Sequence, residues 1–463
     1  MRIRQSARPV LGTVAMSALL GLSCLIAVNA APVPPRPESQ QEFWARYDRK
    51  DWSAAIDEAH RLVEKSRANP QDQLQIANAL TLLGNAQLSS GDRVNAEASY
   101  REALQITESQ GAGTGPAAVD PLRGLGYSLA LLERHEEAVP YMERALIIIR
   151  RSSGLFDPSQ QGLLRQLAIS LTRIGRAVDA QKQMLYLQRV GERMYGERDP
   201  RMAPVLCVVG DWYIDLGNFL LGRDRYRDAL QIVEKKLGKN DPALVLPLRA
   251  LASSYLQEVY FIAQGYQPLD TRGQDPASFE PKGINPKYIS SDGERALQRA
   301  LSILDSHPDT SPALLAETLI QLGDWYQVKH QPEKALPYYR RAAVLVADAD
   351  KPAAEAAAPL SFPVRVYYPM PPLAMRNRQL APTDTEEKFV SVQFTVTGSG
   401  DVQDAKVIEQ NGSQRQASEA LEAIRAARYR PKFVNGEPVE TQGVVNREVF
   451  RIRKQQDDGD SKS

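Results

Sequence analysis

The sequence predicts a mostly α-helical fold, in which an α-superhelix of repeated helix pairs precedes a small α+β domain. Two observations carry this prediction. Apolar residues recur with a period of 42 positions through most of the chain, and after about residue 362 their spacing changes to the alternation of strands. Charges are balanced, with 57 Lys and Arg against 56 Asp and Glu. A nucleic-acid-binding protein with a clustered basic excess is therefore not expected.

The first thirty residues follow the pattern of a secretory signal peptide. Three arginines precede an apolar stretch at 10–28, and small residues stand at the −3 and −1 positions of the expected cleavage site. We predict a signal peptide at 1–30, cleaved after Ala30, followed by a Pro-rich segment at 31–40. Two alternatives stay open: an uncleaved anchor, since an apolar stretch of 19 residues barely spans a bilayer, and lipidation at Cys24.

Helix pairs with a 42-residue period fill the middle of the chain. Each unit has two amphipathic helices, with large apolar residues at helical spacing. Small residues at the eighth and twentieth positions of a unit let its two helices cross closely. One pair cannot bury its apolar face alone, so successive pairs stack into a superhelix, predicted at 41–346. A leucine marks the same position of each unit, at Leu80, Leu122, Leu164, Leu206, Leu248 and Leu319.

Three segments are not expected to form regular secondary structure. One repeat carries an insertion of 29 residues, at about 264–292, whose four prolines exclude a regular helix. Loops of this length are either functional or simply mobile, and the sequence leaves that choice open. An Ala- and Pro-rich linker is predicted at 347–361, and a disordered tail at 454–463.

The second half of a unit reads small-x3-aromatic-x2-Ala-Leu in Ala96–Leu104 and in Gly222–Leu230. This pattern resembles the tetratricopeptide repeat, and the resemblance covers about residues 40–347. It departs at Leu187-Gln188, where Ala-Leu is usual, which weakens that unit alone. The turns resemble the long-loop repeats of kinesin light chain, with Asp-Pro pairs at 157–158, 199–200 and 241–242.

The tetratricopeptide resemblance implies that the first helix of each pair lines a concave, peptide-binding surface. The fifth position of three units is an arginine. Arginine gives forked, charge-assisted hydrogen bonds, which suit an acidic segment or a C-terminal carboxylate. In the alternative interpretation, each arginine pairs with a nearby acid on a solvated face. The predicted groove site consists of Arg123, Arg165, Arg249 and Asp211.

After the linker, the pattern predicts a small domain with the order β-β-α-β. Apolar and polar residues alternate from Val390 to Val396, which indicates a half-buried strand. A Gly-rich turn leads to a second strand at 402–409. A helix is expected at 418–429 and a third strand at 444–452.

Short motifs occur in a fixed order in this domain: Tyr368-Pro369, Gly400-Asp401-Val402, Arg428-Tyr429-Arg430-Pro431 and Asn435-Gly436. In this order they resemble the C-terminal domain of TonB, the energy-transducing protein of Gram-negative bacteria. The resemblance covers about residues 362–453. It departs at Glu387-Lys388-Phe389, where family members usually carry a glycine, so a different start of the first strand stays open.

The TonB resemblance implies that the last strand is an open edge, which accepts an extended peptide from an outer-membrane receptor. Backbone hydrogen bonds then give affinity, and alternate side chains give selectivity. In the alternative interpretation, charged residues such as Arg447, Glu448, Arg451 and Arg453 blunt the edge. The predicted edge-strand site consists of Gly443, Val444, Val445, Asn446, Arg447, Glu448, Val449 and Phe450.

These features predict a non-enzymatic periplasmic scaffold or adaptor, in which the groove binds one protein and the C-terminal domain docks a strand of another. The four histidines have no metal-ligand spacing, and we expect no catalytic site and no cofactor. Expected partners are envelope proteins or peptides, including outer-membrane receptors, and neither nucleic acid nor a small-molecule substrate. Two alternatives stay open: a membrane-anchored TonB-type energy transducer that serves outer-membrane transport, and a peptidoglycan-associated structural protein of the cell envelope.

Overall fold

The computed structural model describes residues 37–69, 71–266, 289–347, 360–376 and 385–454. The predicted signal peptide, and most of the predicted insertion, linker and tail, lie outside these residues. The chain divides into two compact units, residues 1–209 and 210–463. None of the described helices combines the length and the apolar character needed to cross a membrane.

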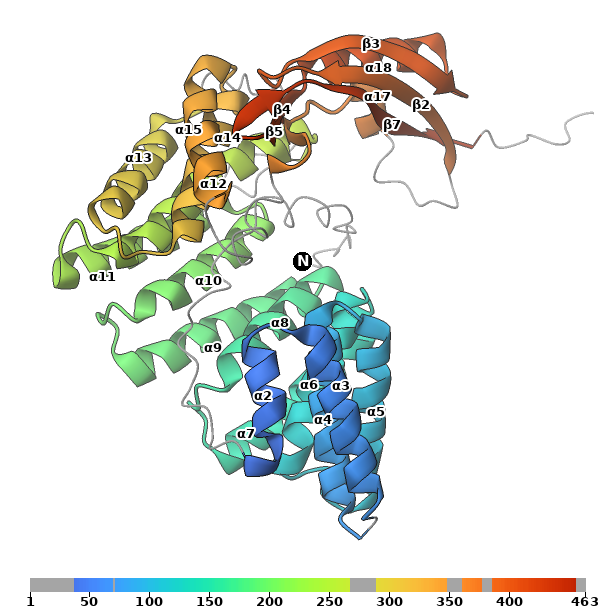
Figure 1. Ribbon diagram of the computed structural model, residues 1–463, viewed down its shortest axis with the longest axis vertical. Helices are drawn as coiled ribbons and strands as arrows, with labels where there is room; N and C mark the ends of the chain where they lie inside the picture. The colour runs from blue at the N-terminus through green and yellow to red at the C-terminus, as the bar shows by residue number, and fades with distance from the viewer. Residues whose placement is uncertain (1–36, 70, 267–288, 348–359, 377–384, 455–463) are drawn as a thin grey trace, which may run out of the picture. The chain divides into compact units, whose positions relative to one another are not determined.

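The first unit is a stack of helix pairs (Figure 1). Helices α4 and α5, α6 and α7, and α8 and α9 pack as pairs, and the first helices of successive pairs also touch. This is the predicted stacking, in which each pair buries its apolar face against the next. The helices are α2 (Gln41–Asp48), α3 (Trp52–Arg67), α4 (Gln73–Ser90), α5 (Arg93–Ser109), α6 (Val119–Leu131), α7 (His135–Ser152), α8 (Gln160–Arg173), α9 (Ala177–Tyr195) and the start of α10 (Met202–Asp215).

Local signals in the sequence set the ends of these helices. The Asp72 side chain accepts a hydrogen bond from the backbone N–H of Gln75 at the start of α4, and Asp92 does the same for Asn95 at the start of α5. Such caps satisfy backbone donors that the first turn leaves without partners. Gly91 ends α4 with φ of 92°, a left-handed conformation that glycine adopts without a steric penalty.

Close contacts between helices require the small residues of the repeat. A Cβ atom on Gly84 would lie 2.8 Å from the ring of Tyr100, and one on Gly124 would lie 2.2 Å from it. Tyr100 is fully buried between them. Gly84 holds the eighth position of its unit, so the predicted role of the small residues is confirmed there.

The second unit begins with more helix pairs. Helices α12 and α13 pack against each other although the predicted insertion separates them in the sequence. The insertion therefore separates, in the sequence, the two helices of one pair. The helices are α11 (Phe219–Leu237), α12 (Val245–Ala263), α13 (Ser291–Ser306), α14 (Pro312–Val328) and α15 (Pro332–Ala347).

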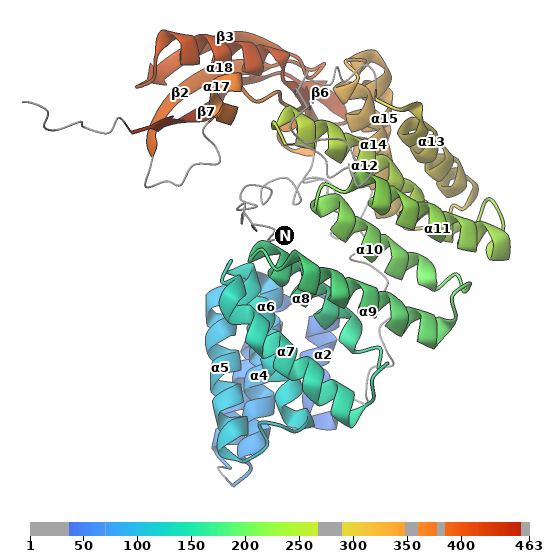
Figure 2. The same ribbon diagram turned by 180° about the vertical axis from the view of Figure 1, so that it is seen from behind.

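The C-terminal domain, part of the second unit, contains an antiparallel sheet with the strand order β3-β2-β7. Helix α18 packs on β2 and β3, as Figure 2 shows from behind. Two small strand pairs, β1 with β4 and β5 with β6, lie beside the sheet. The elements are β1 (Val364–Tyr367), α17 (Pro372–Arg376), β2 (Thr385–Val396), β3 (Val402–Gln410), α18 (Gln414–Ala426), β4 (Arg428–Arg430), β5 (Lys432–Val434), β6 (Glu437–Val439) and β7 (Thr441–Arg453).

The domain has its own apolar core. Val390, Val392 and Phe394 of β2 pack with Ile424 of α18 and Phe450 of β7, and each is at most 2% exposed. The predicted alternation of β2 is therefore confirmed on this face. On the other face, Ser391 and Thr395 are buried and Gln393 is half-buried, whereas Glu387 near the start of the strand is exposed.

The domain has more elements than the predicted order β-β-α-β. Strands β1, β4, β5 and β6 have three or four residues each, too few for periodicity to reveal them. The helix begins at Gln414 rather than 418, because Ser413 and Gln416 form a capping box, which satisfies backbone donors of the first turn. The last strand begins at Thr441 rather than 444.

Candidate protein-binding surfaces

Strand β7, which carries the predicted edge-strand site, lies at the border of the three-stranded sheet. Among the described strands, β2 is its hydrogen-bonded neighbour. Val445 is 53% exposed and Val449 is 41% exposed, whereas Phe450 is fully buried. The alternation thus places apolar side chains on the outer face of β7, beside a backbone edge that β2 does not occupy.

The inner face of β7 is held by the segment around β1. The hydroxyl of Tyr368 donates a hydrogen bond to Glu448 Oε2 at 2.5 Å, and Arg365 Nη1 donates to Asn446 Oδ1 at 3.0 Å. Burial raises the pKa of Tyr368, and the charge of Glu448 raises it further. The phenol therefore stays protonated and keeps donating to the carboxylate.

The charged residues of β7 make contacts on the two faces of the sheet. Glu448 is 9% exposed and accepts the Tyr368 hydrogen bond. Arg447 lies over the ring of Phe389, 3.5 Å from its centroid, a cation–π geometry. Arg451 Nε lies 3.3 Å from Glu387 Oε1. These three side chains are thus engaged within the domain, and Arg453 is exposed at the end of the strand.

In the first unit, Arg123 and Arg165 of the predicted groove site lie near one tyrosine. Burial raises the pKa of Tyr127 to about 12, and the positive charges of Arg123 and Arg165 act against that rise. Arg123 also forms an ion pair with Asp120, one turn earlier on α6. Helices α6 and α8 therefore present two guanidinium groups and a phenol together. Tyr127 follows Arg123 by four residues, so helical spacing could have revealed it.

The other two residues of the predicted groove site belong to the second unit and have partners there. Arg249 Nη1 lies 3.0 Å from Glu317 Oε2, and Arg249 Nε donates to Gln321 Oε1 at 3.0 Å. Its side chain is only 11% exposed. Asp211 accepts a hydrogen bond from the Tyr226 hydroxyl at 2.7 Å. Arg249 thus joins α12 to α14.

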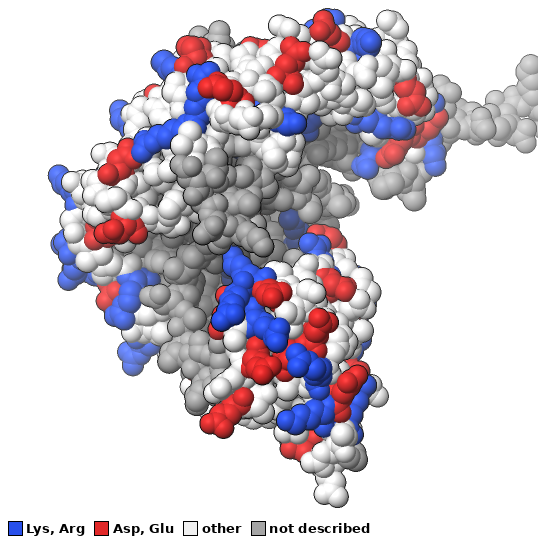
Figure 3. Space-filling view, in the orientation of Figure 1, with Lys and Arg blue, Asp and Glu red and all other residues white. Residues whose placement is uncertain are grey.

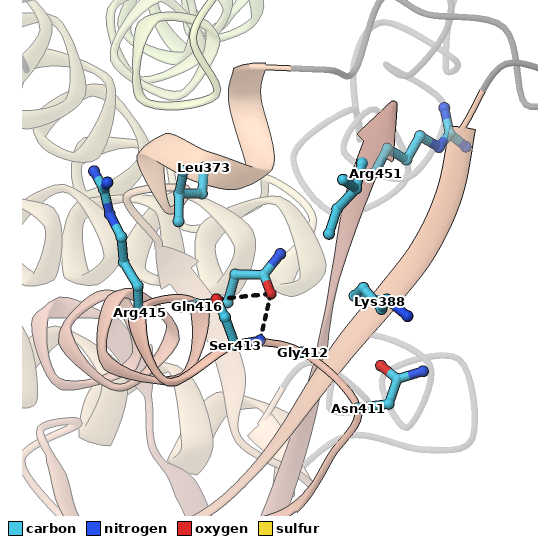
Figure 4. A pocket seen from close by; sticks show the side chains of 9 residues that line it. Leu373, Lys388, Asn411, Gly412, Ser413, Arg415, Gln416 and Arg451 are labelled. Carbon is cyan, nitrogen blue, oxygen red and sulfur yellow. Dashed lines mark hydrogen bonds between the residues drawn. The ribbon is translucent and has the colours of Figure 1, made fainter. Parts of the chain in front are cut away.

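A pocket of about 480 Å³ opens near the start of α18 (Figure 4). Ser413 and Gln416 bond to each other at its floor and occupy the N-terminus of the helix. Each cation that lines the pocket has an acidic neighbour: Lys388 pairs with Glu386, Arg415 with Glu419, and Arg451 with Glu387. The described residues therefore offer no free charge for a ligand here.

The described residues contain no candidate metal centre, and the face shown in Figure 3 has no large area of a single charge sign. No group of three His, Cys, Asp or Glu side chains is placed to hold a metal ion within the described residues. On the face shown in Figure 3, Lys and Arg alternate with Asp and Glu in small groups. Such a surface suits specific local contacts better than long-range attraction of a polyanion.

Family models match both regions of the chain. The model of the Gram-negative bacterial TonB protein C-terminal matches residues 384–452, and tetratricopeptide repeat models match residues 79–112 and 122–159. The chain therefore contains tetratricopeptide repeats and a TonB C-terminal-like domain, and the predicted fold class is confirmed. No curated protein matches the sequence.

The chain is similar to several solved structures at low identity. BtubC (BKLC) from P. vanneervenii is 16% identical, with a TM-score of 0.34 over 67% of this chain and 92% of its own. A tetratricopeptide repeat protein from Parabacteroides merdae is 14% identical, with a TM-score of 0.37 over 69% of this chain and 96% of its own. A repeat protein from Cytophaga hutchinsonii is 11% identical, with a TM-score of 0.32 over 68% and 98%.

Proposed function

We propose that this protein is a non-enzymatic adaptor of the periplasm, which joins two protein partners of the cell envelope. Tetratricopeptide repeats are protein-interaction folds, and a TonB C-terminal-like domain indicates the Gram-negative envelope. The observation that carries the proposal is β7, a border strand with exposed valines in a domain of that type. An extended segment of a partner adds to such an edge through backbone hydrogen bonds.

A photo-crosslinking amino acid at Val445 or Val449, in cells of the native host, tests this docking. Both positions should crosslink to one partner. Ile408 is a matched control, because it lies on β3, at the opposite border of the sheet, and is 49% exposed. Crosslinks at Ile408 that equal those at the two valines would contradict docking on β7.

A second binding surface is proposed on the first unit, at Arg123, Arg165 and Tyr127. Two guanidinium groups beside a phenol suit an acidic segment or a C-terminal carboxylate of the other partner. The double variant Arg123→Glu and Arg165→Glu should lose capture of that partner, with a nearly unchanged melting temperature. Arg151→Glu is the control, since Arg151 is exposed on α7, outside the cluster. Arg249 is left intact, because its ion pair with Glu317 holds two helices together.

N-terminal sequencing of the protein from fractionated host cells separates the adaptor from the energy transducer. A start at Ala31 in the periplasmic fraction supports a soluble adaptor. An intact Met1 in the inner-membrane fraction supports the membrane-anchored alternative that serves outer-membrane transport. Sedimentation with purified sacculi would instead favour the peptidoglycan-associated structural protein.

A further inference from the structure

One tyrosine contact recurs in three of the helix pairs. In each, a tyrosine of the second helix donates a hydrogen bond of 2.7 Å to a side chain 15 residues earlier, on the first helix. The accepting residue directly follows a glycine that the tyrosine ring covers. The three pairs are Tyr100 with Asn85, Tyr226 with Asp211, and Tyr339 with Asp324.

In the first of these pairs, the next repeat closes over the tyrosine. Gly124 of α6 lies so near the Tyr100 ring that a Cβ atom would meet it at 2.2 Å. Burial raises the pKa of Tyr100, and the charge of the neighbouring Arg123 opposes that rise. Where two repeats meet, the next repeat thus places the backbone of Gly124 and the side chain of Arg123 near the tyrosine.

The last pair has no further repeat, and the C-terminal domain covers its tyrosine instead. Arg430 of β4 donates to Asp324 through Nε at 2.9 Å and through Nη2 at 2.5 Å. The two side chains are only 5% and 3% exposed. Phe433 of β5 meets the Tyr339 ring edge-on, with the centroids 6.0 Å apart. Figure 1 shows β4 and β5 beside α14.

Contacts around this ion pair extend over the end of α14 and α15. Gln327 Nε2 donates to the Ser399 carbonyl at 2.7 Å, and Arg340 bonds to Glu437 at 3.0 Å. Gly400, with φ of 87°, completes the fit. A Cβ atom there would lie 2.0 Å from the Tyr429 carbonyl oxygen and 2.7 Å from Gln327.

We propose that the TonB C-terminal-like domain is the terminal cap of the repeat stack and folds with the last helix pair as one cooperative unit. A helix-pair stack needs a closing element at its end. Asp324 requires the C-terminal domain in particular, because Arg430 of that domain is its cationic partner. A buried carboxylate without such a partner is strongly destabilising. This role is independent of any partner protein.

The cap also fixes the position of β7 relative to α14. Strand β1 contacts α14 and pairs with β4. Arg365 of β1 and the adjoining Tyr368 bond to Asn446 and Glu448 of β7. The border strand is therefore tied to the last repeat through β1, rather than carried at the end of a free tether.

The test uses the full chain with a site for a specific protease inserted between residues 347 and 360. After cleavage, the two fragments of the wild-type protein should elute together in size-exclusion chromatography. Arg430→Met leaves Asp324 without its partner and should separate the fragments. Fragments that separate in the wild type would overturn the proposal.

A paired variant distinguishes loss of the joint from misfolding of the domain. Asp324→Asn keeps an acceptor for Tyr339, as Asn85 does for Tyr100, and removes the buried charge. Combined with Arg430→Met, it should restore co-elution. In the uncleaved chain, Arg430→Met should speed amide exchange in α14 by about tenfold or more, and the double variant should reverse most of that. An unchanged amide exchange rate in α14 of the Arg430→Met variant would also contradict the proposed cap.

Discussion

The two units use their ion pairs differently. Every ion pair identified in the described part of the first unit has a partner that is at least 40% exposed, as in Arg123 with Asp120 and Arg144 with Glu108. In the second unit, Arg249 with Glu317 and Arg430 with Asp324 have both partners at 25% exposure or less. Exposed pairs contribute about 0–1 kcal/mol, whereas breaking a buried pair leaves an uncompensated charge.

This difference is instructive because Arg123 and Arg249 hold the same position of the repeat. The period placed both on the first helix of a pair, but it could not specify what packs opposite. In the first unit, stability rests on apolar contacts between helices. In the second, buried charge pairs add to those contacts: Arg249 joins α12 to α14, and Arg430 joins β4 to α14.

The largest expected effect concerns the apolar contacts of the first unit. Leu122 of α6 is fully buried, so Leu122→Ala should lower the free energy of unfolding of that unit by about 3 kcal/mol through lost burial and the cavity left behind. Hydrogen exchange of the α6 amides measures the local value. A loss below that of an ion-pair variant in the same unit would contradict the assigned role of apolar packing.

The arginine pair gives the next effect. Arg249→Met should destabilise the second unit by about 2 kcal/mol, because Glu317 and Gln321 lose a partly buried partner. Arg123→Met should change the first unit by about 0.5 kcal/mol or less, since its ion pair is exposed. Exchange rates of α14 and α6 amides report each value. Equal losses of unfolding free energy in the two variants would contradict the proposed difference between exposed and buried ion pairs.

The smallest effect concerns pH. Burial works to raise the pKa of Glu294, but Lys329 and the Tyr326 hydroxyl outweigh it and hold that pKa below its usual value near 4.5. The resulting stabilisation of the second unit is present above pH 4.5 and is lost as the pH falls through the lowered pKa. Lys329→Met should reduce this acid loss by less than about 1 kcal/mol. Denaturant unfolding at several acidic pH values measures it, and an unchanged pH dependence would exclude the pair as its source.

Much of the fold could be predicted from the sequence, because the 42-residue period fixes which residues meet within and between helix pairs. The three-stranded sheet followed from alternation and from turn glycines. The short strands β1 and β4 could not be found, since three or four residues carry no period. The buried ion pair of Arg430 joins residues 106 positions apart, and no local pattern encodes such a contact.

The candidate sites were predictable in part. The sequence suggested that Glu448 is one of the charged residues that blunt the edge of the sheet. In the structure, its side chain is buried and accepts a hydrogen bond from Tyr368, 80 residues away. Sequence spacing alone gave no sign of that pairing. Tyr127 was within reach of helical spacing, because it lies one turn after Arg123.

Strand β1 affects how the protein can be dissected. The TonB family match begins at residue 384, whereas β1 spans Val364–Tyr367 and supplies the pairing partner of β4. A fragment cut at the family boundary would lack that strand and the side chains that hold Asn446 and Glu448. The smallest fragment that keeps β1 with the rest of the domain therefore starts near Leu360, which is itself buried. Even that module would expose the surface through which it meets α14.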